Sequence, residues 1–321
     1  EEAYLAPDKP LLIDEYLGHA TELDVDAAAD GEQVLVGAIM EHLEQAGIHS
    51  GDSTCFIPTQ NISQEMLKRV DEQTRIIGLK LKIKGCYNIQ FAIQGDNLYC
   101  LEVNPRSSRT VPFVAKSTGL PMARIAARIT IGIPLSQQEI PRRTTGHVCV
   151  KAPVFPFIKL RGLDPAPGPE MKSTGEVFGS DIRADLAYLK ARLATEIPVA
   201  TEGGAYLTVR EEDKAALVPI AQSLIDINFT IFATPGTADV LRKANIPVTT
   251  SYRIAERMHP DSLDLMRKGD VNFIVNVPTI SGGAVRDGNM MRRLAVELNI
   301  PFVTTMRGAV MEVAAMKARL E

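Results

Sequence analysis

Three oxygen-bearing side chains are spaced so that they could hold one metal ion: Gln90, Glu102 and Asn104. Glu102 and Asn104 are two residues apart in a strand-like run, and alternate residues of a strand point to the same face. If the preceding run pairs so that Gln90 lies opposite Glu102, all three side chains share that face. One carboxylate and two amide oxygens form a hard-oxygen site, which suits a Mg²⁺ ion that keeps waters and shares phosphate ligands.

The elements that must position these side chains are two strands joined by a short turn. Pairing Gln90 with Glu102 leaves residues 95–97, Gly-Asp-Asn, as a three-residue loop, and glycine and asparagine accept a positive φ at little cost. In strict alternation, the second strand turns three side chains away from the metal face: Tyr99, Leu101 and Val103.

Two arginines follow the second strand closely. Arg106 and Arg109 carry guanidinium groups, which form paired hydrogen bonds with phosphate or carboxylate oxygens. The cluster therefore offers a metal site beside an anion site, as phosphoryl transfer requires. A Glu-Val-Asn run by itself also fits an ordinary hairpin with a solvated polar face, so the spacing alone leaves both interpretations open.

The whole segment resembles part of a known family. Gln90, Glu102, Asn104, Arg106 and Arg109, followed by TVPFVAKSTG, resemble the metal-binding segment of ATP-grasp domains, specifically that of the carbamoyl phosphate synthase large subunit. The resemblance implies an α/β chain that begins with a partial ATP-grasp domain of α+β type with an antiparallel sheet. It implies ATP and Mg²⁺ or Mn²⁺ as cofactors, with Gln90, Glu102 and Asn104 as metal ligands and Gln90 and Glu102 also at the nucleotide. Arg109 and Arg106 would act in catalysis, balancing charge on the transferring phosphoryl group or orienting carbamate.

An acidic strand precedes this segment. Glu22, Asp24 and Asp26 would share one strand face, which in most proteins is simply solvated. The resemblance implies instead that this face looks toward a nucleotide, with Glu22 at the ribose hydroxyls. It places the adenine hinge at Glu15 and Leu17, and it places four further residues along the nucleotide site: Gly47, Ile48, His49 and Ser50.

The next stretch crowds acidic, histidine and serine side chains together. His42 and His49 lack the i, i+4 spacing of a helical zinc site, so zinc is disfavoured. The resemblance implies a monovalent-cation site for K⁺ around His42, Glu44 and Ser53. It also places Glu44 and Asp52 where the family has acidic contacts to an amine effector.

The remaining segments before residue 200 predict packing elements. We expect a helix from its N-cap Ser63 to about Lys82, and another over residues 121–130. Residues 132–169 are rich in proline, which predicts the closing strands of a first domain and a connection. A helix over residues 181–193 is expected to follow.

Residues 191–321 predict a second domain, after a first domain of residues 1–190. Five apolar runs alternate there with helical patterns, which indicates a parallel, Rossmann-type sheet with helices on both faces. In the second run, Thr234 leads through Pro-Gly to Thr237, where hydroxyls and helix N-terminal N–H groups could bind an anion. Such a sequence is more often only a turn and a cap. The five runs are 205–209, 230–234, 247–250, 272–277 and 301–305.

This second half resembles the methylglyoxal-synthase-like regulatory domain that ends the carbamoyl phosphate synthase large subunit. Arg253 stands where some members have lysine, and Val277 and Pro278 replace threonines, so the identity of the effector stays open. The glycine- and aspartate-rich catalytic stretch of true methylglyoxal synthases is not recognisable around residues 258–264, which favours binding over catalysis. By this resemblance a phosphorylated or acidic effector would bind Lys214, Thr234, Thr237, Arg253 and Asn276.

The composition disfavours several classes of partner and location. The chain has 321 residues, a net charge of −4 and a pI of about 5.9, which argue against a general nucleic-acid surface. Four scattered cysteines show neither CxxC spacing nor the density of a disulfide scaffold. No segment resembles a signal peptide or an apolar run of about eighteen residues, so we expect no membrane contact and a cytoplasmic location.

The two resemblances together predict part of a carbamoyl phosphate synthase large subunit. The complete assembly would phosphorylate carbamate with ATP, giving carbamoyl phosphate and ADP for arginine and pyrimidine biosynthesis. Residues 1–27 retain only the last strands of the half that normally precedes this part of an ATP-grasp unit, so we expect a split-gene product or a piece of a longer protein, inactive alone. The expected partners are the missing N-terminal part, a glutamine amidotransferase small subunit and a small-molecule effector, and a homo-oligomer stays open.

Three alternatives also stay open. Another ATP-grasp ligase would phosphorylate a different carboxylate, or the chain could be only a regulatory and assembly module. The second domain could be a methylglyoxal synthase in its own right. A dinucleotide-dependent oxidoreductase is disfavoured, because no G-x-G-x-x-G opens a helix after a strand.

Overall fold

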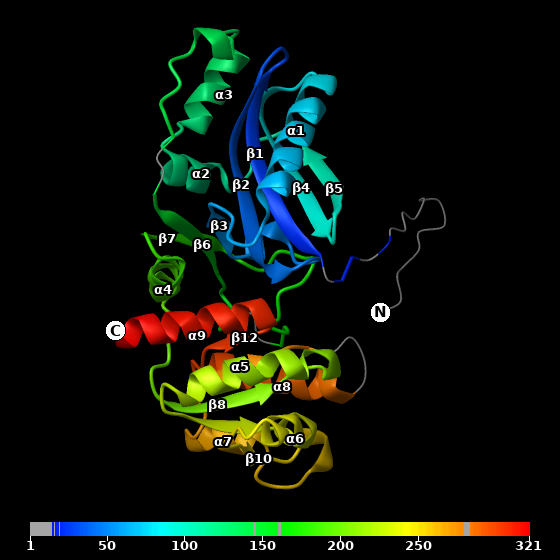
Figure 1. The fold of residues 1–321 in the computed structure, drawn as a ribbon, viewed down its shortest axis with the longest axis vertical. Helices are drawn as coiled ribbons and strands as arrows, with labels where there is room; N and C mark the ends of the chain where they lie inside the picture. Colours follow the sequence, from blue (N-terminus) through cyan, green and yellow to red (C-terminus); the bar gives the residue numbers. More distant parts are fainter. Residues whose placement is uncertain (1–14, 16, 19, 144–145, 160–161, 279–282) are drawn as a thin grey trace.

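The computed structural model contains two β-sheets that lie one above the other along the longest axis of the molecule (Figure 1). The described residues are 15, 17–18, 20–143, 146–159, 162–278 and 283–321. The first sheet is antiparallel and the second is parallel, so the predicted order of the two fold types is confirmed. Of the strands expected within residues 1–27, any part within residues 1–14 lies outside the described residues.

The first sheet has seven strands in the order β5-β4-β1-β2-β3-β6-β7, and its neighbouring strands are antiparallel. Alternate residues of the central strand β1 face different surroundings. Leu23, Val25 and Ala27 pack in the cluster beneath helix α1 (Gln64–Lys80), so Glu22, Asp24 and Asp26 face the other side. The strands are β1 (Thr21–Asp30), β2 (Val34–Gln45), β3 (Cys55–Ile57), β4 (Lys84–Gln94), β5 (Asn97–Asn104), β6 (Val148–Val154) and β7 (Gly175–Asp181).

The β4–β5 hairpin contains a β-bulge that the sequence did not predict. Gln90 pairs with Glu102, so this part of the predicted register is confirmed. The next residue, Phe91, pairs with Cys100, which leaves Leu101 as the extra residue of the bulge. Leu101 is exposed, so no buried side chain marks its position in the sequence pattern.

The bulge changes both the turn and the faces of β5. Gln94 pairs with Asn97, so the turn holds only residues 95–96, and the predicted three-residue loop is wrong. Tyr99 packs with Ala92, on the same face as the predicted metal ligands. Strict alternation had predicted the opposite face for Tyr99, and the extra residue reverses that relation.

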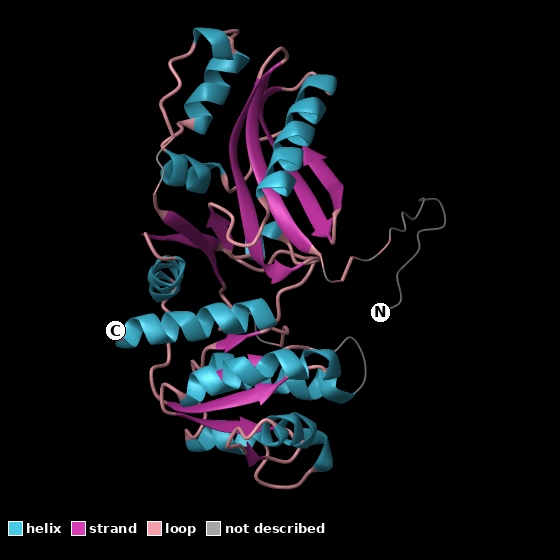
Figure 2. Ribbon diagram, in the orientation of Figure 1, coloured by secondary structure: helices cyan, strands magenta, loops and turns pink. Residues whose placement is uncertain are grey.

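Helices cover both faces of the seven-stranded sheet (Figure 2). The hydroxyl of Ser63 accepts the N–H of Met66, which confirms the predicted N-cap of α1. Helices α2 and α3 pack on the other face through a cluster that includes Met40, Val114 and Ile125. The helices of this part are η1 (Ser50–Asp52), α1 (Gln64–Lys80), α2 (Val111–Thr118), α3 (Met122–Thr130), η2 (Leu135–Gln137) and α4 (Ala184–Ala194).

The second sheet has five parallel strands in the order β10-β9-β8-β11-β12, and each predicted apolar run overlaps one of them. The carboxyl ends of β8, β9 and β11 meet at one edge of the sheet, where ligands of such folds bind. The strands are β8 (Gly203–Thr208), β9 (Phe229–Ala233), β10 (Thr249–Thr250), β11 (Phe273–Asn276) and β12 (Phe302–Val303). The helices are η3 (Glu211–Asp213), α5 (Lys214–Ile225), α6 (Pro235–Lys243), η4 (Ile254–Glu256), α7 (Ser262–Lys268), α8 (Gly283–Glu297) and α9 (Met306–Leu320).

Helix α9 lies between the two sheets and joins them (Figure 1). One apolar cluster includes Phe56 from the first sheet and Ile231 from the second. Inside this region the buried carboxylate of Glu312 accepts hydrogen bonds from Tyr188, at 2.7 Å, and from Arg192, at 2.9 Å. The two parts of the chain therefore share a packed and charged interface.

Candidate functional sites

A polar pocket of about 100 Å³ lies beside the β4–β5 hairpin, and we call it the hairpin pocket. It brings together all three predicted metal ligands, both predicted catalytic arginines, and residues from η1 and β6. Its lining residues are Asp24, His49, Ser50, Gly51, Asn88, Gln90, Glu102, Asn104, Arg106, Ser108, Arg109, Thr110, Lys151 and Glu176.

Hydrogen bonds orient the amides of the predicted metal site. Nε2 of Gln90 donates to Oγ of Ser50 at 3.0 Å, and Nδ2 of Asn104 donates to Oε1 of Glu102 at 2.7 Å. Both amides donate through nitrogen, so their oxygens remain as acceptors. Two amide oxygens and one carboxylate on one pocket wall are a donor set that fits Mg²⁺ or Mn²⁺.

The two arginines lie in the loop between β5 and α2 and are exposed at the pocket. The backbone N–H of Arg106 donates to the carbonyl of Asn104 at 2.8 Å, which turns the chain directly after the strand. Nη1 of Arg109 contacts the sulfur of Met171. Exposed guanidinium groups at a pocket mouth are suited to bind an incoming anion.

Lys151 is a pocket residue that sequence reasoning missed. It is only 1% exposed, and its Nζ donates to the carbonyl of Ser50 at 3.0 Å and lies 3.8 Å from Glu176. Burial lowers the pKa of Lys151, but four nearby groups together raise it above its usual value: Cys55, Glu176, Asp24 and Glu44. The available signal was a lysine inside the apolar strand β6, where an unpaired charge would be costly.

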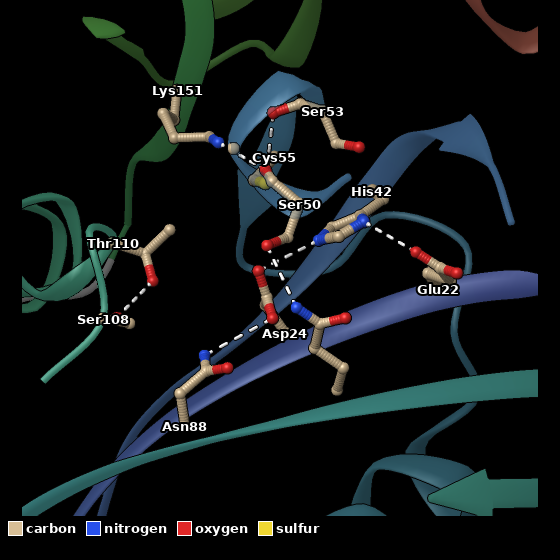
Figure 3. Close-up of polar contacts among 12 residues, drawn as sticks. Glu22, Asp24, His42, Ser50, Ser53, Cys55, Asn88, Ser108, Thr110 and Lys151 are labelled. Atoms are coloured by element: carbon tan, nitrogen blue, oxygen red, sulfur yellow. Dashed lines mark hydrogen bonds and ion pairs between the residues drawn. The ribbon is translucent and has the colours of Figure 1, made fainter. Parts of the chain in front are cut away.

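The acidic face of β1 forms a buried cluster with His42 of β2 (Figure 3). Nδ1 of His42 lies 3.5 Å from Glu22, and Nε2 lies 3.3 Å from Asp24. Burial alone would lower the pKa of His42, but Cys55 and both carboxylates raise it well above its usual value. Burial raises the pKa of Asp24, but His42, Lys151 and Asn88 together lower it below its ordinary value.

Glu22, the predicted ribose ligand, is turned toward protein groups. It is 6% exposed, and besides His42 it contacts the N–H of Gly47, which donates to Oε1 of Glu22 at 3.0 Å. Glu22 is not among the residues that line the hairpin pocket. To bind ribose hydroxyls as predicted, Glu22 would have to give up its contacts with His42 and Gly47.

The other predicted nucleotide residues divide into two groups. His49 and Ser50 line the hairpin pocket, whereas Gly47 and Ile48 do not. Glu15 is exposed, and Leu17 packs with an apolar cluster. The structure therefore brings only part of the predicted nucleotide set to the metal ligands, and the adenine assignment stays a prediction.

The predicted K⁺ ligands belong to separate sets of hydrogen bonds. Glu44 accepts the N–H of Thr54 at 2.6 Å, and Oγ of Ser53 donates to the carbonyl of His49 at 3.4 Å. The imidazole of His42 instead faces the carboxylates of β1. The K⁺ site stays a prediction.

The two predicted acidic contacts to an amine effector line an apolar cavity of about 180 Å³ that has walls from both parts of the chain. Burial raises the pKa of Glu44. The carboxylate of Asp52 accepts the N–H groups of Lys172 and Ser173, at 2.8 and 2.9 Å. Asp52 therefore holds the connecting segment against η1, whether or not it also binds an effector.

A second polar pocket, of about 360 Å³, lies at the carboxyl ends of β8, β9 and β11, and we call it the effector pocket. Thr234 is the N-cap of α6, and its Oγ1 lies 3.4 Å from Oγ1 of Thr237. Nζ of Lys214 pairs with Glu211 at 2.5 Å. The predicted amine-effector contacts Glu44 and Asp52 do not line this pocket. The five residues predicted to bind a phosphorylated or acidic effector all line it: Lys214, Thr234, Thr237, Arg253 and Asn276.

Arg292 is a buried residue that contacts Asn276 in the wall of the effector pocket, and sequence reasoning missed it as well. It is 1% exposed and forms two hydrogen bonds with the carboxylate of Asp164, at 2.9 and 2.5 Å. Its third contact is to the amide oxygen of Asn276. Asp164 lies more than a hundred residues away in the connecting segment, so no local spacing marks this pair.

One further group of side chains in the described part of the chain has the spacing of metal ligands. His259, Asp261 and Asp264 each place one ligand atom within 4.8 Å of the other two, and Asp261 also caps α7. In the described residues, no helix combines the length and apolar character needed to cross a membrane.

Known families match both parts of the chain. Residues 2–138 match the family described as carbamoyl-phosphate synthase L chain, ATP binding domain, and residues 216–304 match the MGS-like domain family. The carbamoyl phosphate synthase large chain of Methanosarcina barkeri is 43% identical over 318 residues, which cover 99% of this chain and 79% of that protein. The C-terminal section of this large chain from Methanocaldococcus jannaschii is also 43% identical, over 99% of this chain and 53% of that protein.

The chain is much shorter than some other relatives. It matches the large chain of Methanocorpusculum labreanum at 43% identity over 96% of its own length but only 29% of that protein. Among solved structures, the biotin carboxylase subunit of pyruvate carboxylase has 13% identity and a TM-score of 0.44, over 57% of this chain and 46% of that one.

Proposed function

This chain belongs to the carbamoyl phosphate synthase large-chain family, and we propose that within a complete assembly it phosphorylates carbamate with ATP. The products would be carbamoyl phosphate and ADP, for arginine and pyrimidine biosynthesis. The observation that carries the proposal is the hairpin pocket, because the carboxylate of Glu102 and the amides of Gln90 and Asn104 meet two guanidinium groups there.

The proposed assembly requires an additional N-terminal part of the large chain. This is supported by the Methanocaldococcus jannaschii relative, which is named as a C-terminal section. A glutamine amidotransferase small subunit is the proposed source of ammonia. Within this chain, we assign residues 1–190 to the ATP-grasp part and residues 191–321 to the regulatory domain.

The side chains of the hairpin pocket have two proposed roles, metal binding and anion binding. Gln90, Glu102 and Asn104 would hold Mg²⁺ or Mn²⁺, which when bound neutralises charge on the β- and γ-phosphate oxygens of ATP. Arg109 and Arg106 hold the oxygens of the transferring phosphoryl group or of carbamate. Such catalysis works by positioning and electrostatics, with little covalent chemistry by the protein.

The direct test combines the purified chain with the N-terminal part and measures ATP formed from carbamoyl phosphate and MgADP. We expect Glu102→Gln to lower this rate by about 10²–10³-fold, because the variant loses the only charged metal ligand of the set. Glu72→Gln, an exposed site on α1, is the matched control and should keep the wild-type rate. A mixture no more active than its separate parts, or a fully active Glu102→Gln, would contradict the proposal.

Two of the alternatives predict different outcomes. A ligase for another carboxylate would release phosphate from ATP with that acid but not with bicarbonate and ammonia. A regulatory and assembly module would bind its partner and its effector, and Glu102→Gln would then have no effect on any rate.

The effector pocket supports a second part of the proposal, the binding of an anionic small molecule. Hydroxyls of Thr234 and Thr237 lie at the N-terminus of α6, beside Lys214 and Arg253, and such groups bind phosphate or carboxylate oxygens. Thermal shift with nucleoside monophosphates, amino acids and acylated amino acids should identify a stabilising compound. A shift that survives Thr234→Ala unchanged would remove this pocket as the binding site, and formation of methylglyoxal from dihydroxyacetone phosphate would assign catalysis instead.

A further inference from the structure

Asp26 is a buried carboxylate beneath the loop that carries the two arginines. Its Oδ1 accepts a hydrogen bond from Oγ of Ser108 at 2.6 Å, and its Oδ2 accepts one from Oγ1 of Thr110 at 2.6 Å. The two hydroxyls also lie 2.8 Å from each other (Figure 3). Arg109 is the residue between them, so both of its chain neighbours are bound to one carboxylate.

The same carboxylate ties the loop to the sheet. Nδ2 of Asn88 on β4 donates to Oδ1 of Asp26 at 3.0 Å, and Asp26 itself lies on the central strand β1. Asn88, Ser108 and Thr110 all line the hairpin pocket, whereas Asp26 does not. Asp26 therefore acts on the pocket only through other residues.

At Thr110, the hydrogen bond to Asp26 takes the place of an ordinary helix-capping hydrogen bond. It occupies the N-cap position of α2, where a threonine hydroxyl usually accepts an N–H of the first helical turn. Here the side chain makes no capping bond and donates to Asp26 instead. The hydroxyl thus fixes the loop before α2 rather than the first turn of the helix.

A carboxylate suits this position because it only accepts hydrogen bonds, and it can accept all three donors at once. An asparagine at the same place would offer a single acceptor oxygen. Asp26 is 1% exposed, and burial raises its pKa to about 6 even though Ser108 and Thr110 lower it. An ionised group in this environment is unfavourable for folding, so stability alone does not explain its presence.

We propose that Asp26 is a positioning residue for phosphoryl transfer, which holds Ser108 and Thr110 so that Arg106 and Arg109 face the metal ligands. The inference rests on the proposed function of the hairpin pocket. It adds a residue that touches neither substrate nor metal.

The test compares Asp26→Asn with the double variant Ser108→Ala/Thr110→Ala, which removes the two donors and leaves the carboxylate. Asp30→Asn is the matched control, because Asp30 lies on the same strand and, among the described residues, accepts only the backbone N–H groups of Glu32, Gln33 and Leu135. Each variant is combined with the N-terminal part, and ATP formation from carbamoyl phosphate and MgADP is measured. Hydrogen–deuterium exchange of residues 106–110 is measured on the chain alone.

We expect Asp26→Asn and the double variant each to lower kcat by about tenfold or more, with KM for MgADP changed less than about threefold. Residues 106–110 should exchange faster in both, and Asp30→Asn should match the wild type. Unchanged kcat in Asp26→Asn would overturn the proposal, as would a lower kcat with wild-type exchange in the loop. If the wild-type assembly makes no ATP, the proposed function fails, while the exchange measurement still shows whether Asp26 fixes the loop.

Discussion

The hairpin pocket and the effector pocket gather polar groups in different ways. The hairpin pocket uses side chains of adjacent antiparallel strands and the loop that follows, and a buried acidic cluster lies beneath it. The effector pocket uses the carboxyl ends of parallel strands and a helix N-terminus, where backbone N–H groups and hydroxyls supplement the charged side chains. We therefore expect single substitutions to act strongly in the first pocket and more weakly at the mouth of the second.

The largest effect is expected at Arg109. Arg109→Ala should lower carbamoyl phosphate formation by the assembly by about 10²–10³-fold, because a charge-stabilising donor at the reacting anion is lost. Arg124→Ala, on the exposed face of α3, should keep the wild-type rate. The thermal shift caused by an effector-pocket ligand should be the same in both variants, and its loss in Arg109→Ala would break the distinction between the pockets.

The second effect concerns the support of the effector pocket. Arg292→Met should lower the free energy of unfolding by about 2–4 kcal/mol, because it leaves Asp164 and Asn276 without their buried partner. Arg293→Met, at the exposed neighbouring position, should change it by less than about 0.5 kcal/mol. Chemical denaturation measures the free energy of unfolding of each variant. If Arg292→Met is as stable as Arg293→Met, the buried ion pair contributes nothing measurable to stability.

Features that follow local sequence patterns were predictable, whereas features that depend on distant residues were not. Glu102 and Asn104 were predictable because strand alternation is a local rule, and the parallel sheet was predictable because each apolar run repeats the same pattern. The bulge at Leu101 was not, because an exposed extra residue leaves no mark in the hydrophobic pattern. Arg292 and Asp26 were not assigned roles, because the ion-pair partner of Arg292 lies 128 positions away and the partners of Asp26 lie at least 62 positions away. Only the fold brings these groups together.

The third prediction concerns how the ionisation of buried Asp26 changes the stability of the protein with pH. The folded pKa of Asp26, about 6, lies above its ordinary value of 3.8, so the folded state binds the proton more tightly than the unfolded state. Wild-type stability from this group is therefore present below pH 4 and is lost as pH rises to 6. The stability of Asp26→Asn relative to wild type should grow by roughly 1–3 kcal/mol between pH 4 and pH 7.

Asp30 provides a control of opposite sign for that measurement. Hydrogen bonds from backbone N–H groups outweigh burial and lower its pKa, so its stabilising contribution is present above the ordinary value and is lost as pH falls. Asp30→Asn should therefore be less stable than wild type at pH 7, and this difference should shrink toward pH 3. If the stability difference from wild type changed with pH in the same way for Asp26→Asn and Asp30→Asn, ionisation of the buried Asp26 would not destabilise the folded state.

The smallest effect is expected at the mouth of the effector pocket. Lys214→Met should weaken binding of inorganic phosphate by about three- to tenfold, because one partly screened charge is removed while the hydroxyls and N–H groups remain. Lys243→Met, exposed near the end of α6, should not change binding. Thermal shift against phosphate concentration measures both, and complete loss of binding in Lys214→Met would make this pocket as dependent on single charges as the hairpin pocket.

The central claim is that Gln90, Glu102 and Asn104 form one divalent-metal site, and anomalous scattering from Mn²⁺ tests it most directly. In crystals of the assembly with ADP and Mn²⁺, we predict a peak about 2.0–2.3 Å from oxygens of all three side chains. A peak at His259, Asp261 and Asp264 instead, with the amide of Gln90 turned away from Glu102, would contradict the account.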